Sequence, residues 1–66
     1  MEVLVNGSRE QLPPGTTVSE LVERMALAGR RVAVERNGEI VPRSAHPQVV
    51  LADGDRVEVV VAVGGG

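Results

Sequence analysis

Apolar and polar positions follow two different periods along this chain, and the change of period predicts an α+β domain. The first segment, Met1–Asn6, is short and aliphatic, and it ends in Asn6-Gly7. This dipeptide favours a tight hairpin turn because both residues tolerate positive φ. The more polar Arg9–Leu12 is predicted to return antiparallel. Pro13-Pro14 follows it and cannot donate ladder hydrogen bonds, so this second strand is expected at an edge of the sheet.

The next segment has the period of a helix. Thr17-Val18-Ser19-Glu20 has the form of a capping box, in which the Thr hydroxyl and the Glu carboxylate each accept from the other residue's backbone amide. Gly29 suits the C-cap. One amphipathic helix of three turns is therefore expected, with Ser19, Glu23 and Arg24 on its polar face. The apolar positions of this helix are Val18, Leu21, Val22, Met25 and Ala28.

A second hairpin is predicted further along the chain. Arg31–Arg36 and Glu39–Pro42 are the expected strands, and they flank a second tight-turn dipeptide, Asn37-Gly38. Pro42 ends the later strand early. This strand is therefore expected at the other edge of the sheet.

The last part of the chain carries the longest predicted strand. Ser44–Gln48 is irregular, and Val49–Leu51 is expected to pack as a short apolar plug before a turn at Asp53-Gly54-Asp55. The strand that follows, Arg56–Val63, alternates at first and then becomes apolar on both faces. An apolar pattern on both faces favours a central position in the sheet.

The resulting order is ββαβββ, and it restricts the topology. A single helix must cover one face of a mixed five-stranded sheet, because nothing else is available to bury that face. If the first and last strands are neighbours, they run parallel and are joined by a right-handed crossover. This is the β-grasp, or ubiquitin-like, architecture, and we expect residues 1–66 to form a single domain of this kind.

Composition narrows the classes of function. The chain has no cysteine and one histidine, so thiolate or histidine metal sites are excluded and neither a metal nor a cofactor is expected. The net charge of −2 and the absence of aromatic residues argue against a nucleic-acid partner. All seven basic residues are Arg. No apolar run approaches about 20 residues, so no membrane contact is predicted and the cytoplasm is the default location.

Catalytic groups are scarce. Ser44 and His46 with Asp53 or Asp55 would contain the residue types of a catalytic triad, but His46 lies in a loop between Ala45 and Pro47. We interpret His46 as a surface turn residue and the Asp-Gly-Asp segment as a tight turn. No phosphate-binding loop is present. The chain is therefore expected to be no enzyme, with no catalytic residues.

The C-terminal glycines are the most informative feature that remains. Gly64-Gly65-Gly66 follows the last strand, and three extended residues reach roughly 10 Å. A flexible tail without Cβ atoms can thread a narrow channel. The Gly66 carboxylate is a poor electrophile, so it needs activation, and a partner must supply the ATP. The alternative is a frayed terminus without function.

The whole chain resembles the ThiS-like sulfur carrier family of thiamine biosynthesis, which is ubiquitin-like. The combination of NGEIVPR with terminal glycines is its most specific part. The departures are the lack of aromatic residues and a third glycine, Gly64, ahead of the usual pair. The resemblance is carried by Thr17–Val22 (TVSELV), Val32–Arg43 (VAVERNGEIVPR), Asp53–Val57 (DGDRV) and the glycines.

The resemblance implies a function for the tail. An E1-like adenylyltransferase would form an acyl-adenylate on Gly66, and a cysteine desulfurase persulfide would supply sulfur for a C-terminal thiocarboxylate. Thiazole synthase would then take the sulfur. Gly64 and Gly65 would give the tail access to partner active sites. Possible docking residues are Asn37, Gly38, Ile40, Pro42 and Arg43, although Asn37-Gly38 also has the plain role of a hairpin turn.

Three alternatives stay open. The first is a sulfur carrier of the same fold that serves molybdopterin, cysteine or tRNA thiolation. The second is a ubiquitin-like modifier that is attached to other proteins. The third is an interaction module with a passive tail.

Overall fold

The computed structural model describes residues 1–62. Its elements confirm the predicted ββαβββ order and add one 3₁₀ turn, η1, between the fourth and fifth strands. In chain order they are β1 (Glu2–Val5), β2 (Ser8–Gln11), α1 (Val18–Arg24), β3 (Val32–Arg36), β4 (Glu39–Val41), η1 (Arg43–Ala45) and β5 (Arg56–Val61).

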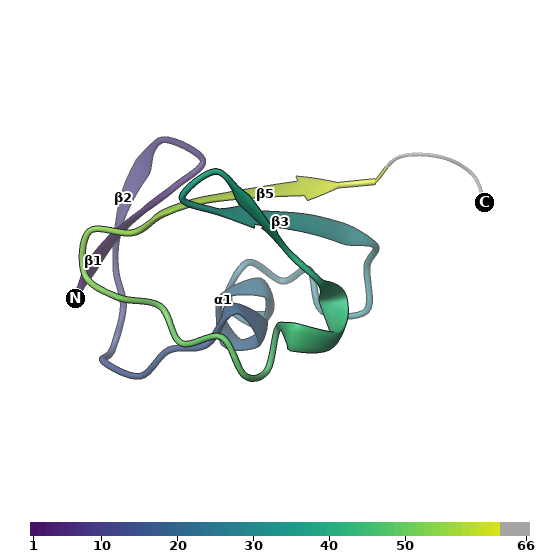
Figure 1. Cartoon of the computed structure of the whole chain (residues 1–66), viewed down its shortest axis with the longest axis horizontal. Helices are drawn as coiled ribbons and strands as arrows, with labels where there is room; N and C mark the ends of the chain where they lie inside the picture. Colours follow the sequence, from purple (N-terminus) through teal and green to yellow (C-terminus); the bar gives the residue numbers. More distant parts are fainter. Residues whose placement is uncertain (63–66) are drawn as a thin grey trace.

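The five strands form one mixed sheet in the order β2-β1-β5-β3-β4. The first and last strands, β1 and β5, pair in parallel through Leu4↔Arg56 and Val5↔Val57, and all other pairs are antiparallel. The predicted β-grasp topology is thus confirmed, with β5 at the centre and β2 and β4 at the edges (Figure 1).

Both predicted hairpin turns have the expected backbone conformation. Asn6 and Gly7 have φ values of 51° and 84°, and Asn37 and Gly38 have the same pair of values. Two consecutive residues at positive φ match the right-handed twist of the flanking strands, which explains the preference for Asn-Gly.

The helix begins as predicted and ends earlier than predicted. Both hydrogen bonds of the capping box are present: the Thr17 side chain accepts from the Glu20 amide, and the Glu20 carboxylate accepts from the Thr17 amide. The helix has only 7 residues, however, so the predicted three turns are wrong and Gly29 is not the C-cap.

A Schellman motif ends the helix. Ala26 has a φ of 60°, its amide donates to the Glu23 carbonyl (2.9 Å), and the Leu27 amide donates to the Val22 carbonyl (3.0 Å). The motif turns Leu27 against the core, where it is partly buried, and leaves Ala28 exposed. The apolar contact of Leu27 therefore ends the helix at a residue that is not glycine.

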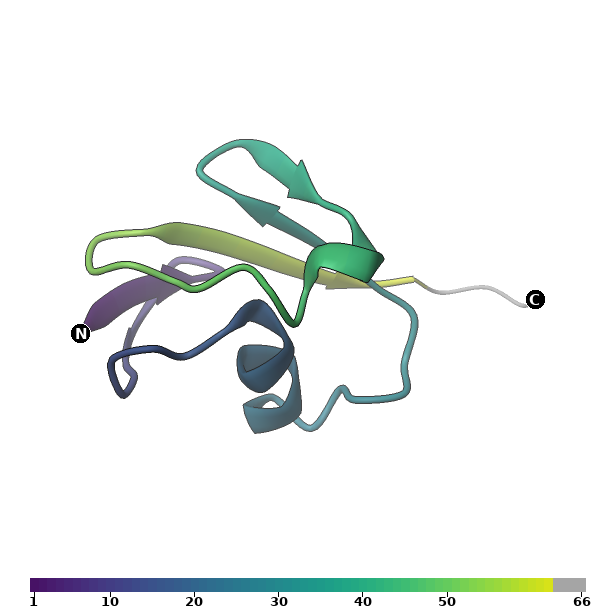
Figure 2. The same ribbon diagram turned by 60° about the horizontal axis from the view of Figure 1, so that its bottom comes forward.

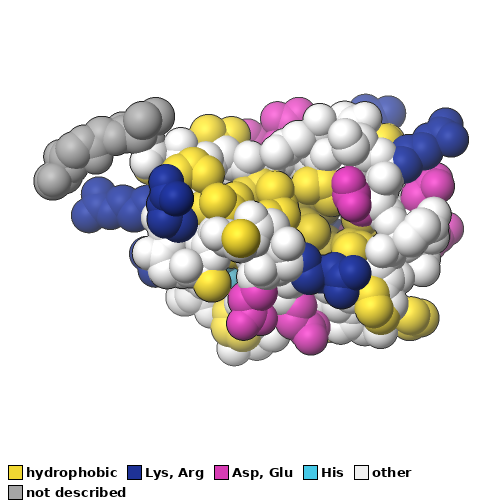
Figure 3. All heavy atoms as spheres, turned by 180° about the vertical axis from the view of Figure 1, so that it is seen from behind, with side chains coloured by type: hydrophobic (Ala, Val, Ile, Leu, Met, Phe, Trp, Pro, Cys, Tyr) yellow, Lys and Arg dark blue, Asp and Glu magenta, His cyan; other side chains and the backbone are white. Residues whose placement is uncertain are grey.

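The core is aliphatic and lies between α1 and one face of the sheet. Val3, Val18, Val34 and Val57 are its most deeply buried side chains. Figure 2 shows α1 and η1 on the same side of β5, with no element on the other side of the sheet. Figure 3 shows that some hydrophobic side chains reach the surface in the middle of one face, as expected for a small domain that cannot cover its whole core.

The apolar pattern of the last strand has a different cause from the predicted one. Val57 and Val59 of β5 are buried under α1, whereas Val60 is 59% exposed on the uncovered face. The central position was predicted correctly, but a single helix buries only one face of the sheet. The strand ends at Val61, and Val63 lies outside the described residues.

Candidate functional site

The site begins where β5 ends. Val61 pairs with Val32 at the last position of the β3–β5 ladder, and the Ala62 amide donates to the Arg31 carbonyl (2.9 Å). This end of β5 lies at the opposite end of the molecule from the N-terminus (Figure 1). The predicted site residues Gly64, Gly65 and Gly66 follow it in sequence and lie outside the described residues.

The antiparallel β3–β5 register separates the five predicted docking residues into two groups. Asn37 and Gly38 turn beside Arg56 at the start of β5, because the Asn37 amide donates to the Arg56 carbonyl (2.8 Å). The start and the end of β5 are five residues apart, or about 17 Å. The turn is therefore remote from the last position of the ladder, where the tail begins.

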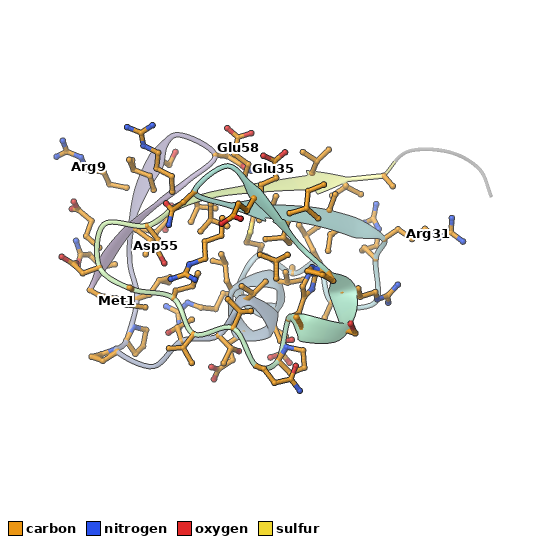
Figure 4. The ribbon with its side chains drawn as sticks, viewed as in Figure 1. Met1, Arg9, Arg31, Glu35, Asp55 and Glu58 are labelled. Atoms are coloured by element: carbon orange, nitrogen blue, oxygen red, sulfur yellow. The ribbon has the colours of Figure 1, made fainter. Side chains whose placement is uncertain are left out.

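The other predicted docking residues follow the turn. Ile40 on β4 is 73% exposed, and Pro42 is the N-cap of η1. Arg43 begins η1 and lines a cleft with Arg30 and Val32, next to the last position of the β3–β5 ladder. The cleft therefore brings Arg43 close to the base of the tail. Arg31, on the same side, points away from the body of the domain (Figure 4).

The Asn37 side chain has a structural role. Its Nδ2 donates to Asp55 Oδ1 (3.0 Å), and its Oδ1 accepts from the Arg56 amide (2.9 Å). These two bonds tie the β3–β4 turn to the start of the central strand. Exposed backbone at Gly38 remains available for contact with a partner.

Asp55 is the centre of a buried polar network that the sequence analysis missed. The turn at Asp53-Gly54 was predicted correctly, but Asp55 itself is only 6% exposed. Its carboxylate accepts from Arg36 Nε (2.8 Å), from Asn37 Nδ2 (3.0 Å) and from the Ala52 amide (2.8 Å). The signal in the sequence was the second Asp of a Gly turn directly before a long strand, but its partners lie up to 19 residues away.

The electrostatics of Asp55 follow from these contacts. Burial by itself raises the pKa of the carboxyl group, because it disfavours the charged form. The hydrogen bonds from Ala52, Asn37 and Arg36, together with the charge of Arg36, outweigh burial and lower the pKa of Asp55 below its usual value of 3.8. Asp55 is therefore an ionised structural anchor at the start of β5.

The interpretation of His46 as a surface residue is wrong. The His46 side chain is only 6% exposed, and Nε2 lies 3.1 Å from the Val41 carbonyl oxygen. The His46 carbonyl accepts from the Ser19 amide of α1 (3.1 Å). The turn at η1 places the ring under the end of β4, so His46 links that edge strand to the helix.

The triad residues are not brought together. Asp53 Oδ1 accepts from the Glu2 amide (2.7 Å), and Asp55 is engaged by Arg36, so neither carboxylate orients the His46 ring. Within residues 1–62, no group of three or more acidic or histidine side chains is placed to hold a metal ion. In the same range, α1 is far too short to cross a membrane.

Comparison with known proteins identifies the family. The model of the ThiS family matches residues 3–66. The sulfur carrier protein ThiS of Escherichia coli strain K12 is 33% identical over 66 residues and covers the full length of both chains. The sulfur carrier protein ThiS of Bacillus subtilis strain 168 is 40% identical over 50 residues, or 76% of each chain.

Two further relatives are longer proteins. Thiazole synthase of Paramagnetospirillum magneticum is 42% identical over all 66 residues, and thiazole synthase of Magnetococcus marinus is 39% identical over the same length. The chain spans only 20% of the length of each of these two proteins.

The fold comparison agrees with the family model. A crystal structure of a thiamine biosynthesis protein (ThiS) from Geobacter metallireducens superposes with a TM-score of 0.83 at 35% identity, over the full length of both chains. An identity above 30% over complete chains, together with the family model and the same five-stranded sheet, leaves no other assignment. This chain belongs to the ThiS family.

Proposed function

We propose that this chain is a sulfur carrier that acts through the carboxylate of Gly66. Its family and the full-length match to a relative named as a sulfur carrier protein support this proposal. The family match includes the three glycines. In this role the chain is a protein substrate and not a catalyst, and partner enzymes supply the reactive groups.

The proposed chemistry has two stages. In the first, a carboxylate oxygen of Gly66 attacks the α-phosphorus of ATP on an E1-like adenylyltransferase, which forms the acyl-adenylate and releases pyrophosphate. In the second, the terminal sulfur of a cysteine desulfurase persulfide attacks the acyl carbon and displaces AMP. A thiol then reduces the acyl disulfide and leaves the thiocarboxylate. Because adenylation consumes ATP, we propose that the carrier acts in the cytoplasm.

The single observation that carries this proposal is the position of β5. The central strand is paired on both sides, with β1 and β3, and its ladder with β3 continues to Val61. The glycines therefore follow a rigid, well-defined base. Gly64 and Gly65 would present no Cβ to the channel of a partner, which meets the steric requirement for bringing Gly66 to an active site.

Thiazole formation in thiamine biosynthesis is the proposed destination of the sulfur. The similarity of the complete chain to a part of two thiazole synthases favours thiazole synthase as the acceptor. A carrier for molybdopterin, cysteine or tRNA thiolation would have the same fold, and a protein modifier would use the same adenylate. Arg43, near the base of the tail, and the exposed Asn37-Gly38 turn, Ile40 and Pro42 are the proposed docking residues.

Intact-mass measurement tests the proposal. The chain is co-expressed with the adenylyltransferase and the cysteine desulfurase of its source, and we expect a product in which one oxygen is replaced by sulfur. The variant that lacks Gly66 should fold normally and yield no such product. If wild-type protein remains unmodified with both enzymes active, the carrier function is wrong. Transfer of the sulfur to a thiazole product by thiazole synthase separates thiamine biosynthesis from the other pathways.

A further inference from the structure

The uncovered face of the sheet has an unusual arrangement of side chains. In the β3–β5 ladder Glu35 lies directly opposite Glu58, and Ala33 lies opposite Val60. In the β3–β4 ladder Ile40 lies opposite Glu35. Residues in register on neighbouring strands point to the same face, and the residues between them are buried on the other side of the sheet. These five side chains therefore share the outer face, away from α1.

The central pair is electrostatically unfavourable. Two carboxylates directly opposite each other on antiparallel strands repel, and such pairs destabilise a sheet. Within residues 1–62 the only ion pair is Arg36–Asp55, so no arginine of the described chain neutralises Glu35 or Glu58. Figure 4 shows both carboxylates pointing to the same side of the sheet. The isolated domain thus keeps an uncompensated charge pair at the middle of its sheet.

Large apolar side chains flank this pair. Ile40 is 73% exposed and Val60 is 59% exposed, and these are two of the three large hydrophobic residues that the described chain exposes. Val60 lies one residue before the end of β5. The acidic and apolar surface is therefore continuous with the base of the tail.

We propose that this outer face, formed by Ala33, Glu35, Ile40, Glu58 and Val60, docks a protein surface that inserts an arginine or lysine between the two carboxylates. The occupant is the adenylyltransferase that takes the tail, so the inference rests on the proposed function. Charge complementarity selects a cation at the centre, because it relieves the repulsion, and Ile40 and Val60 select apolar neighbours around it. The same surface repels anionic ligands such as nucleic acid.

The stability of the free domain is the first test. Glu35→Gln and Glu58→Gln each remove the repulsion, so we expect each to raise the melting temperature by roughly 2–4 °C at low salt. This gain should shrink in 1 M NaCl, because salt already screens the pair in the wild type. Glu23→Gln on α1 is the matched control. It makes the same change of charge on the other side of the molecule and should leave the melting temperature unchanged.

The affinity for the adenylyltransferase is the second test, measured by calorimetry without ATP. Each of the two Gln variants should bind about tenfold more weakly, because one charge-assisted contact is lost. Glu58→Arg should bind more weakly still, although it should be at least as stable as the Gln variants through a new pair with Glu35. Glu23→Gln should bind like the wild type. Variants that are more stable and bind less tightly are the expected signature of a face kept for docking.

The outcomes are distinguishable. If both Gln variants bind within twofold of the wild type, or if the wild type does not bind the enzyme at all, the docking proposal is wrong. If they lose stability, the pair is not repulsive and the argument from strain fails. If the wild type binds and the variants bind weakly, but no adenylate forms with ATP, the docking face stands and the proposed carrier function fails.

Discussion

The side chain of Asn6 forms two hydrogen bonds with the backbone of Val59, which lies 53 residues later. Asn6 Oδ1 accepts from the Val59 amide (2.8 Å), and Nδ2 donates to the Val59 carbonyl (3.1 Å). The side-chain amide thus continues the parallel β1–β5 ladder beyond the point where the β1 backbone turns away. Asn37 bonds to Arg56 on the other side of β5. The two hairpin turns therefore hold the central strand, and with it the base of the tail, from both sides.

Replacing Asn6 by Gly should weaken this hold. Asn6→Gly keeps the positive φ of the turn but removes both hydrogen bonds to Val59, so we expect the free energy of unfolding to fall by about 1–3 kcal/mol. Urea unfolding measures the change. Ser8→Ala in the same hairpin, at an exposed position, should change it by less than about 0.5 kcal/mol. Equal stability of wild type and Asn6→Gly would show that the two bonds contribute nothing net.

Asp55 should make the domain sensitive to acid. Its pKa is lowered in the folded state, so its stabilising contribution is complete above the unfolded pKa of about 3.9 and is lost as the pH falls from there through the folded value. Asp55→Asn should cost about 2 kcal/mol at pH 7, because the contacts with Arg36 and Asn37 are weakened. The free energy of unfolding of this variant should also fall less between pH 5 and pH 2, both flagged here as approximate limits of the titration. Parallel pH curves for the two proteins would contradict the role of Asp55.

Ala26 is a site for stabilisation. The residue pays a steric cost at a φ of 60°, where glycine is at ease, so Ala26→Gly should raise the free energy of unfolding by about 1 kcal/mol. Ala28→Gly, in the same loop but not at positive φ, should give no gain. Thermal unfolding of both variants checks the prediction, and a destabilised Ala26→Gly protein would mean that the Schellman motif is not the cause of the early helix end.

The tail should tolerate no side chain at its penultimate position. Gly65→Val adds a branched Cβ where the proposed channel requires none, so we expect adenylation to fall at least about 100-fold in kcat/KM. The melting temperature should stay that of the wild type, because the ladder ends at Val61. Pyrophosphate exchange with the adenylyltransferase is the measurement. Normal exchange by this variant would show that the channel is not narrow.

Local signals in the sequence were enough for most of the secondary structure. The two Asn-Gly dipeptides, the prolines after the edge strands and the capping box at Thr17 each report on the backbone within a few residues. The helix end shows the limit of such signals. Gly29 is the residue that favours a C-cap, yet the contact of Leu27 with the core ends the helix earlier, at a less favourable residue.

The sequence by itself determined the order of the elements, the β-grasp topology and the choice of the C-terminal glycines as the candidate reactive end, because turn chemistry, hydrophobic period and chain order are local or additive properties. Only the tertiary structure decided that His46 and Asp55 are buried and that Glu35 faces Glu58. These features depend on strand register and on contacts between residues far apart in the chain. A shift of one residue in register would turn each side chain to the other face of the sheet.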